Sequence, residues 1–181
     1  MGDPRNFTSS ETLRSGLAVT VRALRADDRE RMARAIRGLD RESIYTRLFS
    51  YRSELTEAGL DRVMRFDPDT EVVLVVTTSI AGDEIVIGAG RYVASTPGGG
   101  DRAAEVAFMV EEDYHGLGIA GRLLRHLADI ARASGIGSFK AEVLSGNNSM
   151  LAVFARSGLP MRKRLEGGVV HVTLSLLGDP A

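Results

Sequence analysis

Apolar and polar residues recur along the chain with two periods, one typical of strands and one typical of helices. Alternation or a short apolar run marks strand segments at 17–24, 71–80, 85–94, 104–110, 137–144, 161–165 and 169–176. Apolar residues three and four apart mark helix segments at 27–39, 40–49, 56–66, 118–134 and 147–157. This order predicts an α+β fold, with a mixed, mostly antiparallel sheet of about seven strands and helices on both faces.

The segment 104–124 joins a predicted strand to a predicted helix through a glycine-rich turn. Glu105 is the one charged residue of the strand, and the turn reads His-Gly-Leu-Gly-Ile-Ala-Gly over residues 115–121. Small residues at the start of a helix leave several backbone N–H groups without partners, and the helix dipole places positive charge there. The segment therefore predicts a site that binds phosphate oxygens.

The glycine spacing also fits the G-x-G-x-x-G motif of dinucleotide-binding folds, at Gly116, Gly118 and Gly121. That motif belongs to the first strand of a repeating βαβ unit, with an acidic residue about 20 residues later. Here the glycines follow a predicted antiparallel hairpin, deep in the chain. We therefore favour a different phosphate-bearing ligand.

The 181 residues fit one domain, which we place at 17–177. The preceding segment, 1–16, is polar and unpatterned, and we expect it to be a flexible N-terminal tail. No apolar run reaches the roughly 20 residues that span a bilayer, and the N-terminus lacks the apolar stretch of a signal peptide. We expect a cytoplasmic protein with no membrane partner.

Charges nearly balance, with 23 Lys and Arg against 24 Asp and Glu, so we expect no nucleic-acid partner. The absence of cysteine excludes disulfides, thiolate metal sites and a Cys nucleophile. The histidines are scattered, so we also expect no metal. Of these, His126 is predicted to be solvated on the exposed side of the main helix and His171 to be structural. Residues 162–164 are predicted to form a solvated strand face.

Two motifs within this order resemble those of the GNAT superfamily of acetyl-CoA-dependent N-acetyltransferases. The pyrophosphate loop of that family reads Gln/Arg-x-x-Gly-x-Gly/Ala, which the chain matches at Gly118 and Ala120 and departs from at His115. A second family pattern lies around the last helix. The chain matches it at Asn147, Met150, Phe154 and Gly158-Leu159. The resemblance covers residues 17–176.

The resemblance implies that acetyl-CoA is the co-substrate. In the family, the strands corresponding to 104–110 and 137–144 splay apart at a bulge, and the pantetheine arm lies between them. An N–H near Met109 would polarise the thioester carbonyl. The residues implied to bind acetyl-CoA are Phe108, Met109, Val110, His115, Gly116, Leu117, Gly118, Ile119, Ala120, Gly121, Arg122, Asn147 and Phe154. Arg125 is a further phosphate candidate or a solvated residue, and Asn147 is equally well an N-cap.

An amine acceptor must lose a proton before it attacks, and we predict Glu105 as the general base. Burial in an apolar strand would raise its pKa, and AEVAF at 104–108 resembles a variant of the family that uses a glutamate on this strand. The alternative is a glutamate that faces solvent or pairs with an arginine. Glu111 and Glu112 are weaker candidates. Phe154 stands where many members have a tyrosine that protonates the leaving thiolate, so water or another residue does this, or no acid is needed.

Residues 43–50 (SIYTRLFS), with AEVAF and LSGNNSML, resemble bacterial protein lysine acetyltransferases that act on acyl-CoA synthetases. The resemblance implies a protein lysine as acceptor and an enzyme that is a monomer or a homodimer. Two alternatives stay open: an N-acetyltransferase of small-molecule amines, and a CoA-binding regulatory module that no longer catalyses.

Overall fold

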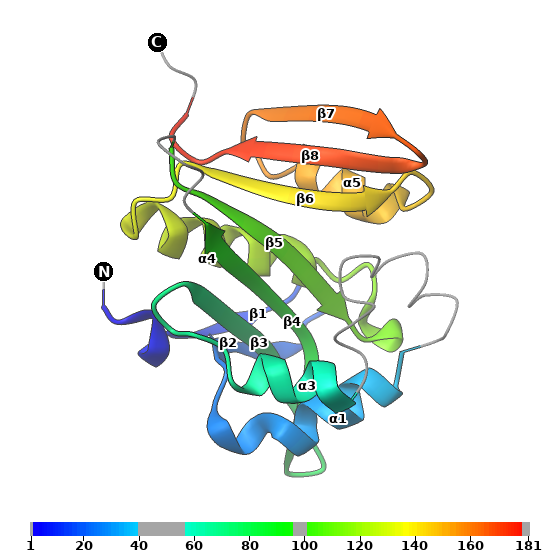
Figure 1. Cartoon of the computed structure of the whole chain (residues 1–181). Helices are drawn as coiled ribbons and strands as arrows, with labels where there is room; N and C mark the ends of the chain where they lie inside the picture. Colours follow the sequence, from blue (N-terminus) through cyan, green and yellow to red (C-terminus); the bar gives the residue numbers. More distant parts are fainter. Residues whose placement is uncertain (1, 40–56, 96–100, 179–181) are drawn as a thin grey trace.

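The structure, a computed structural model, describes residues 2–39, 57–95 and 101–178 (Figure 1). The strands are β1 (Thr8–Thr12), β2 (Ala18–Ala23), β3 (Glu71–Ile80), β4 (Asp83–Ser95), β5 (Ala103–Val110), β6 (Ser138–Leu144), β7 (Met161–Glu166) and β8 (Val169–Ser175). The α-helices are α1 (Arg29–Arg37), α3 (Glu57–Met64), α4 (Ile119–Ala133) and α5 (Asn148–Ala155). Single 3₁₀ turns lie at η1 (Pro4–Asn6), η2 (Ala26–Asp28) and η4 (Glu112–Tyr114).

The strands form one eight-stranded sheet in the order β1-β2-β3-β4-β5-β6-β8-β7. Every neighbouring pair is antiparallel except β5 and β6, which are parallel. The mixed α+β fold and all of the predicted strand segments are confirmed, with one strand more than expected. The helix predicted at 40–49 lies outside the described residues. No helix in the described ranges is long and apolar enough to cross a bilayer.

The additional strand, β1, lies in the segment for which the sequence indicated a flexible tail. It pairs with β2 in antiparallel register at the edge of the sheet. Its side chains alternate between exposed and half-buried, with Ser9 and Glu11 on the half-buried face. Because none of these residues is apolar, the alternation carries no hydrophobic signal. The expectation of a flexible tail is therefore wrong for residues 8–12.

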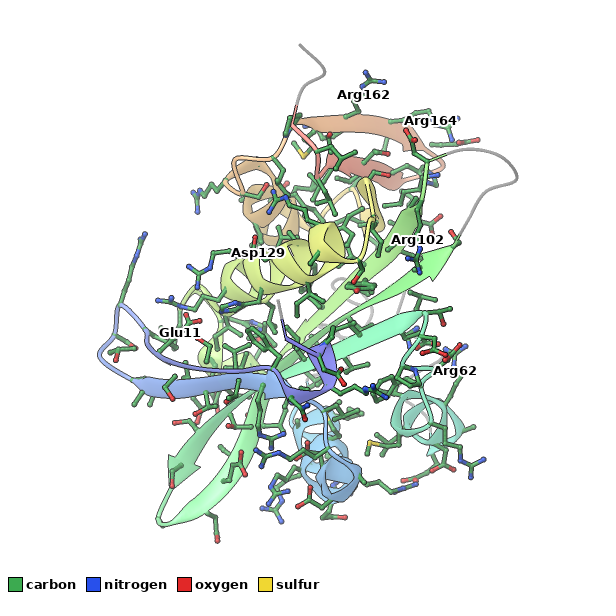
Figure 2. The ribbon with its side chains drawn as sticks, turned by 90° about the vertical axis from the view of Figure 1, so that its left-hand side faces the viewer. Glu11, Arg62, Arg102, Asp129, Arg162 and Arg164 are labelled. Atoms are coloured by element: carbon green, nitrogen blue, oxygen red, sulfur yellow. The ribbon has the colours of Figure 1, made fainter. Side chains whose placement is uncertain are left out.

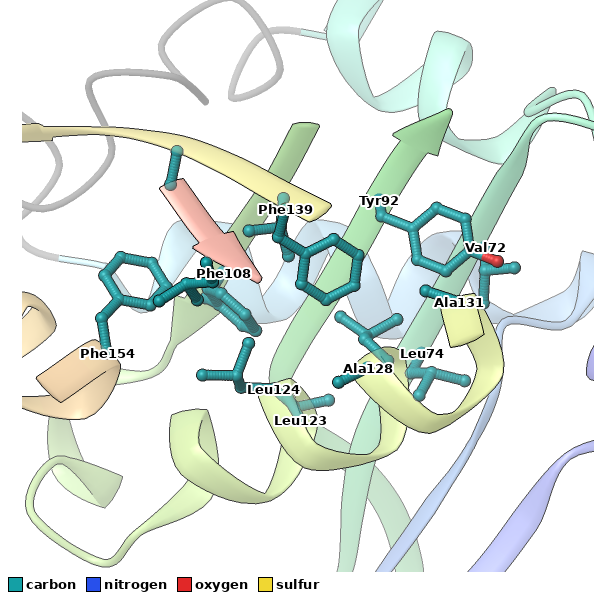
Figure 3. Packing of buried hydrophobic residues seen from close by; sticks show 14 of the residues in the cluster. Val72, Leu74, Tyr92, Phe108, Leu123, Leu124, Ala128, Ala131, Phe139 and Phe154 are labelled. Atoms are coloured by element: carbon teal, nitrogen blue, oxygen red, sulfur yellow. The ribbon is translucent and has the colours of Figure 1, made fainter. Parts of the chain in front are cut away.

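Two hydrophobic clusters lie on opposite faces of the sheet. The larger lies under α4 and α5 (Figure 3), and the smaller lies under α1 and α3. The side chains that α4 buries are Ile119, Leu123, Leu124, Leu127, Ala128, Ile130 and Ala131. Each fully buried leucine contributes about 2 kcal/mol. This apolar face holds α4 firmly on the sheet and so fixes the start of the helix relative to the end of β5.

A buried ion pair holds the start of α1 against the sheet. Arg22 and Asp28 are 2% and 0% exposed, and the guanidinium donates two hydrogen bonds to the carboxylate, of 2.7 and 2.8 Å. The same guanidinium also donates to Glu84 at 2.9 Å, and the Asp28 carboxylate accepts from the Arg25 N–H at 2.7 Å. Burial by itself raises the pKa of Asp28, but the contacts with Arg22 and the Arg25 N–H lower that pKa below its ordinary value.

Candidate active site

β5 and β6 stay paired over only residues 103–105 and 138–140. Beyond these residues β5 pairs with β4 alone, and β6 follows β8, with which it pairs along its whole length. Figure 1 shows the two parallel strands diverging from this point. One edge of each strand therefore faces a gap with no strand in it. The splayed strands implied by the family resemblance are confirmed.

The alternation of hydrogen-bonding groups along β5 decides which of them face this gap. The Glu111 N–H donates to the Ile87 carbonyl of β4 at 2.9 Å. On the other side, the Arg102 carbonyl accepts from the Gly137 N–H, directly before β6, at 2.8 Å. Residues in a strand turn their N–H and C=O groups to alternate sides. The backbone N–H and C=O groups of odd-numbered residues of β5 therefore point toward β4, and those of even-numbered residues point toward β6 or the gap.

This alternation narrows the prediction of an N–H donor near Met109. The N–H groups of Phe108 and Val110 face the gap, whereas that of Met109 faces β4, so a thioester carbonyl in the gap would meet a neighbour of Met109. The register between β4 and β5 is continuous over residues 103–110, so the bulge expected in this strand is absent. The strands part because β6 follows β8 rather than because β5 is irregular.

The glycine loop lies between the end of β5 and the start of α4. Gly116 and Gly118 have φ angles of 76° and 83°, in the left-handed region that residues with a Cβ avoid. The first turn of α4 is closed by the Arg122 N–H, which donates to the Gly118 carbonyl at 3.2 Å. Within the described part of the chain, the N–H groups of 119–121 have no acceptor. With the dipole of a 15-residue helix behind them, they suit phosphate oxygens.

Gly121 supports the same interpretation. It lies in the first turn of α4 with a helical backbone, and a Cβ built there meets nothing within 4 Å. Neither backbone strain nor packing requires glycine at this position. The missing side chain leaves the first turn of α4 uncovered at this position, in the same turn as the free N–H groups, which suits the pyrophosphate of a CoA ester. The residues present therefore fit acetyl-CoA.

His115, the departure from the family loop, has a defined partner. Its Nε2 lies 2.8 Å from the Val110 carbonyl, and because a carbonyl only accepts, Nε2 carries the proton. Its Nδ1 lies 3.7 Å from the Glu112 carboxylate. The ring thus ties the loop to the last residue of β5. It also occupies the carbonyl of Val110, so that residue offers the gap only its N–H.

Arg122, predicted to contact phosphate, is bound by Glu11 of β1; Figure 2 labels Glu11. The Glu11 carboxylate accepts from Arg122 at 2.8 Å and from Arg125 at 3.2 Å, and it also contacts His126 Nε2. Burial raises the pKa of Glu11, but these three partners lower it below its ordinary value. His126 packs against Phe7 and its side chain is 13% exposed, so the prediction that it is solvated is wrong.

Glu105 occupies the last paired position of β5, beside the point where β6 leaves. Its side chain is exposed, because alternation places it on the face opposite the buried Ala104 and Val106. The expectation that Glu105 is buried is therefore wrong, and the desolvation argument for its role is lost. It makes no hydrogen bond or ion pair with any described residue. The carboxylate is thus open to an incoming acceptor from the α1 and α3 side of the sheet.

Glu111, which the sequence ranked behind Glu105, directly follows β5 and is half-buried. It lies against the end of α1, where a Cβ built on Gly38 would come within 3.2 Å of its Oε1. Burial, followed by the charge of Asp113, raises the pKa of Glu111. The pKa of Tyr114 is raised by burial and by the charges of Glu111 and Asp113. Glu111 is therefore a second acid–base candidate, at the loop end of the gap. Its only signal in the sequence is that a carboxylate directly follows an apolar strand.

The last two predicted residues have structural roles. Asn147 Oδ1 accepts from the Met150 N–H at 3.1 Å, so the N-cap alternative is confirmed. Phe154 is 1% exposed and meets Phe108 edge to face, with ring centroids 6.1 Å apart (Figure 3). Both pack at the α5 side of the gap, and a direct contact of either with acetyl-CoA stays a prediction.

The remaining sequence predictions concern β6, β7 and β8, at the other side of the gap. The side chains of residues 162–164 are exposed, as predicted, and Arg162 and Arg164 project from β7 in Figure 2. His171 of β8 lies 3.5 Å from the Glu142 carboxylate of β6, a cross-strand contact. Among the described residues, no three His, Asp or Glu side chains gather into an arrangement that could hold a metal ion.

Residues 40–159 match the Acetyltransferase (GNAT) family, and the chain belongs to that family. An acetyltransferase of Pseudomonas aeruginosa is 34% identical over 143 residues, which cover 77% of this chain and 74% of the relative. The acetyltransferase Pat of Mycolicibacterium smegmatis is 32% identical over 146 residues, which cover 81% of this chain and 42% of the relative. The GNAT domain of S. lividans PAT matches with a TM-score of 0.79 at 34% identity, over 93% of this chain and 96% of that domain. The chain is thus a GNAT acetyltransferase with the fold of a PAT GNAT domain.

Proposed function

We propose that this acetyltransferase moves an acetyl group from acetyl-CoA to a lysine side chain of a protein of the acyl-CoA synthetase type, with Glu105 as general base. The observation that carries the proposal is the parting of β5 and β6 beside Glu105. The likeness to the GNAT domain of PAT supports a protein acceptor. We place the enzyme in the cytoplasm, as a monomer or a homodimer.

The chain offers two sets of donors to acetyl-CoA. The N–H groups of 119–121 and the dipole of α4 would hold the pyrophosphate. The N–H groups of Phe108 and Val110 face the gap and would bind the pantetheine arm and the thioester carbonyl. One well-aimed N–H donor toward a developing oxyanion is worth about 3 kcal/mol of barrier.

Glu105 has the position that a base for a large acceptor requires. Its exposed carboxylate lies where the gap begins, so a lysine carried on another protein can reach it. There it takes a proton from the ammonium, directly or through water, and leaves the lone pair that attacks. Glu111, with its raised pKa, stands at the other end of the gap as a second proton carrier. Phe154 has no proton to give, so we assign protonation of the leaving thiolate to water.

The proposal is tested by release of free CoA from acetyl-CoA, with an acyl-CoA synthetase and a panel of polyamines as acceptors. Glu105→Gln is expected to lower kcat about 100-fold or more. The control is Glu166→Gln, an exposed glutamate at the end of β7. An unchanged rate in Glu105→Gln would show that the base is wrongly assigned. Acetylation of polyamines but of no protein lysine would overturn the acceptor class, and no acetyl-CoA binding by calorimetry would overturn the co-substrate.

A further inference from the structure

The chain has very few lysines. Of its 23 Lys and Arg residues, only Lys140 and Lys163 are lysines. A guanidinium stays protonated in proteins and has no free lone pair to acylate. An enzyme that acetylates amines can therefore modify its own side chains at only these two positions. Both lie within the described residues, on β6 and β7.

Lys140 lies directly beside the proposed base. It is the register partner of Glu105 in the last pair before β5 and β6 part. The residues on either side of each, Phe139 and Ala141 on β6 and Ala104 and Val106 on β5, all belong to the larger hydrophobic cluster. Lys140 and Glu105 therefore project from the opposite face of the sheet, side by side.

The strand spacing places the Lys140 amine within reach of Glu105 and of the closed end of the gap. Neighbouring strands lie about 4.8 Å apart, and a lysine side chain extends roughly 6 Å from its Cα. Both Lys140 and Glu105 are exposed, and neither is engaged in a hydrogen bond or ion pair with a described residue. The amine thus stands at the closed end of the gap, three residues along β5 from Phe108, whose N–H would hold the thioester carbonyl.

Lys163 is the internal comparison. It is also an exposed strand lysine, but its register partner on β8 is Val172, which is 1% exposed within the larger cluster. Cross-strand partners share a face, so Lys163 lies on the α5 side of the sheet. It is separated from Glu105 by two further strands and by the thickness of the sheet.

We propose that Lys140 is a self-acetylation site, an inference that rests on the proposed function. The Lys140 ammonium loses a proton to the Glu105 carboxylate, which passes it to solvent. The neutral Nζ attacks the thioester carbonyl carbon, so that a C–N bond forms, and the C–S bond breaks as the tetrahedral intermediate collapses. The nitrogen gives up its second proton to water as the amide forms, and CoA leaves as the thiolate and takes a proton from water. The products are N-acetyl-Lys140 and CoA, and nothing is oxidised or reduced.

The test is incubation of the full chain with acetyl-CoA and no other acceptor, followed by intact mass and peptide mapping. One acetyl group on Lys140 is expected, with a first-order rate constant that does not change with protein concentration. Lys140→Arg abolishes the modification, while Lys163→Arg leaves it unchanged. Glu105→Gln slows it about 100-fold. Mixed with active enzyme, the Glu105→Gln chain is modified no faster than it is alone, because the transfer is intramolecular.

Several results would overturn the proposal. Equal acetylation of Lys140 and Lys163, or a rate unaffected by Glu105→Gln, would indicate simple chemical acylation by acetyl-CoA. A rate constant that rises with protein concentration would make the transfer intermolecular. No acetyl on Lys140, while CoA is released with an external amine, would refute self-acetylation and leave the proposed function standing. If no amine at all releases CoA, the proposed function fails and takes this inference with it.

Discussion

Two glycines three residues apart are expected to respond to alanine with opposite changes in stability. Gly118 has a φ of 83°, so an alanine there is strained and should lower the free energy of unfolding by about 1–2 kcal/mol. Gly121 is helical with open space at its Cβ position. Alanine there should raise the free energy of unfolding by about 0.5–1 kcal/mol, because it reduces the freedom of the unfolded chain.

Both substitutions should nevertheless weaken acetyl-CoA binding. At Gly121 the new methyl group adds bulk to the turn that carries the free N–H groups of 119–121, and at Gly118 the loop that presents them is distorted. We expect the Kd for acetyl-CoA to rise at least about tenfold in each, the equivalent of losing one hydrogen bond to a charged group. A chain that is more stable and yet binds more weakly, as expected for Gly121→Ala, cannot be explained by partial unfolding.

Urea unfolding gives the stability of each variant, and isothermal calorimetry gives the Kd. The control is Asp129→Ala, an exposed position further along α4 (Figure 2), which should change stability by less than about 0.5 kcal/mol and leave the Kd alone. If Gly121→Ala is stabilised but binds acetyl-CoA as tightly as the natural chain, the pyrophosphate does not lie at this turn.

Further predictions concern two carboxylates that organise the fold. Asp28→Asn breaks the buried pair with Arg22 and should cost about 3–5 kcal/mol in urea unfolding, whereas the exposed Asp27→Asn should cost under about 0.5 kcal/mol; similar losses would contradict the role of burial. The pKa of Asp28 in the folded chain is below its ordinary 3.8, so the Asp28 carboxylate stabilises the fold fully above pH 3.8. This stabilisation is lost as the pH falls through the folded pKa. In acid, the free energies of unfolding of Asp28→Asn and of the natural chain should therefore come closer together. Glu11→Gln should cost about 1–2 kcal/mol near neutral pH and less below pH 4.5, the ordinary value of this group; an undiminished difference in acid would show that its charge is irrelevant.

The sequence predicted the elements of this fold well where the core is apolar. The α4 stripe and the β3–β4 hairpin carry strong periodic signals, and both form as predicted. β1 was missed because its inward residues, Ser9 and Glu11, are polar, and the partners of Glu11 lie more than 100 positions away on α4. A pattern of neighbours along the chain cannot report such a contact.

For the candidate site, the sequence predicted the residues better than their orientations. The apolar strand around Glu105 predicted its location, but the side that each residue faces depends on tertiary pairing. The Glu111 bond to Ile87 sets that side, and with it the availability of the Phe108 and Val110 N–H groups. Exposure of Glu105 likewise depends on how far the helices extend over the sheet. The local periodicity of the sequence predicts neither the register of the strands nor how far the helices cover the sheet.

The position of β1 has a practical consequence for anyone who handles this protein. Residues 8–12 look dispensable in the sequence, and a shortened chain that begins at residue 17 would be an obvious choice for expression. Such a chain would lose Glu11 and release the guanidinium groups of Arg122 and Arg125 beside the phosphate-binding turn. Two freed cations would attract any polyanion in the buffer, so nucleotide affinities measured on the shortened chain would overstate those of the chain that retains β1.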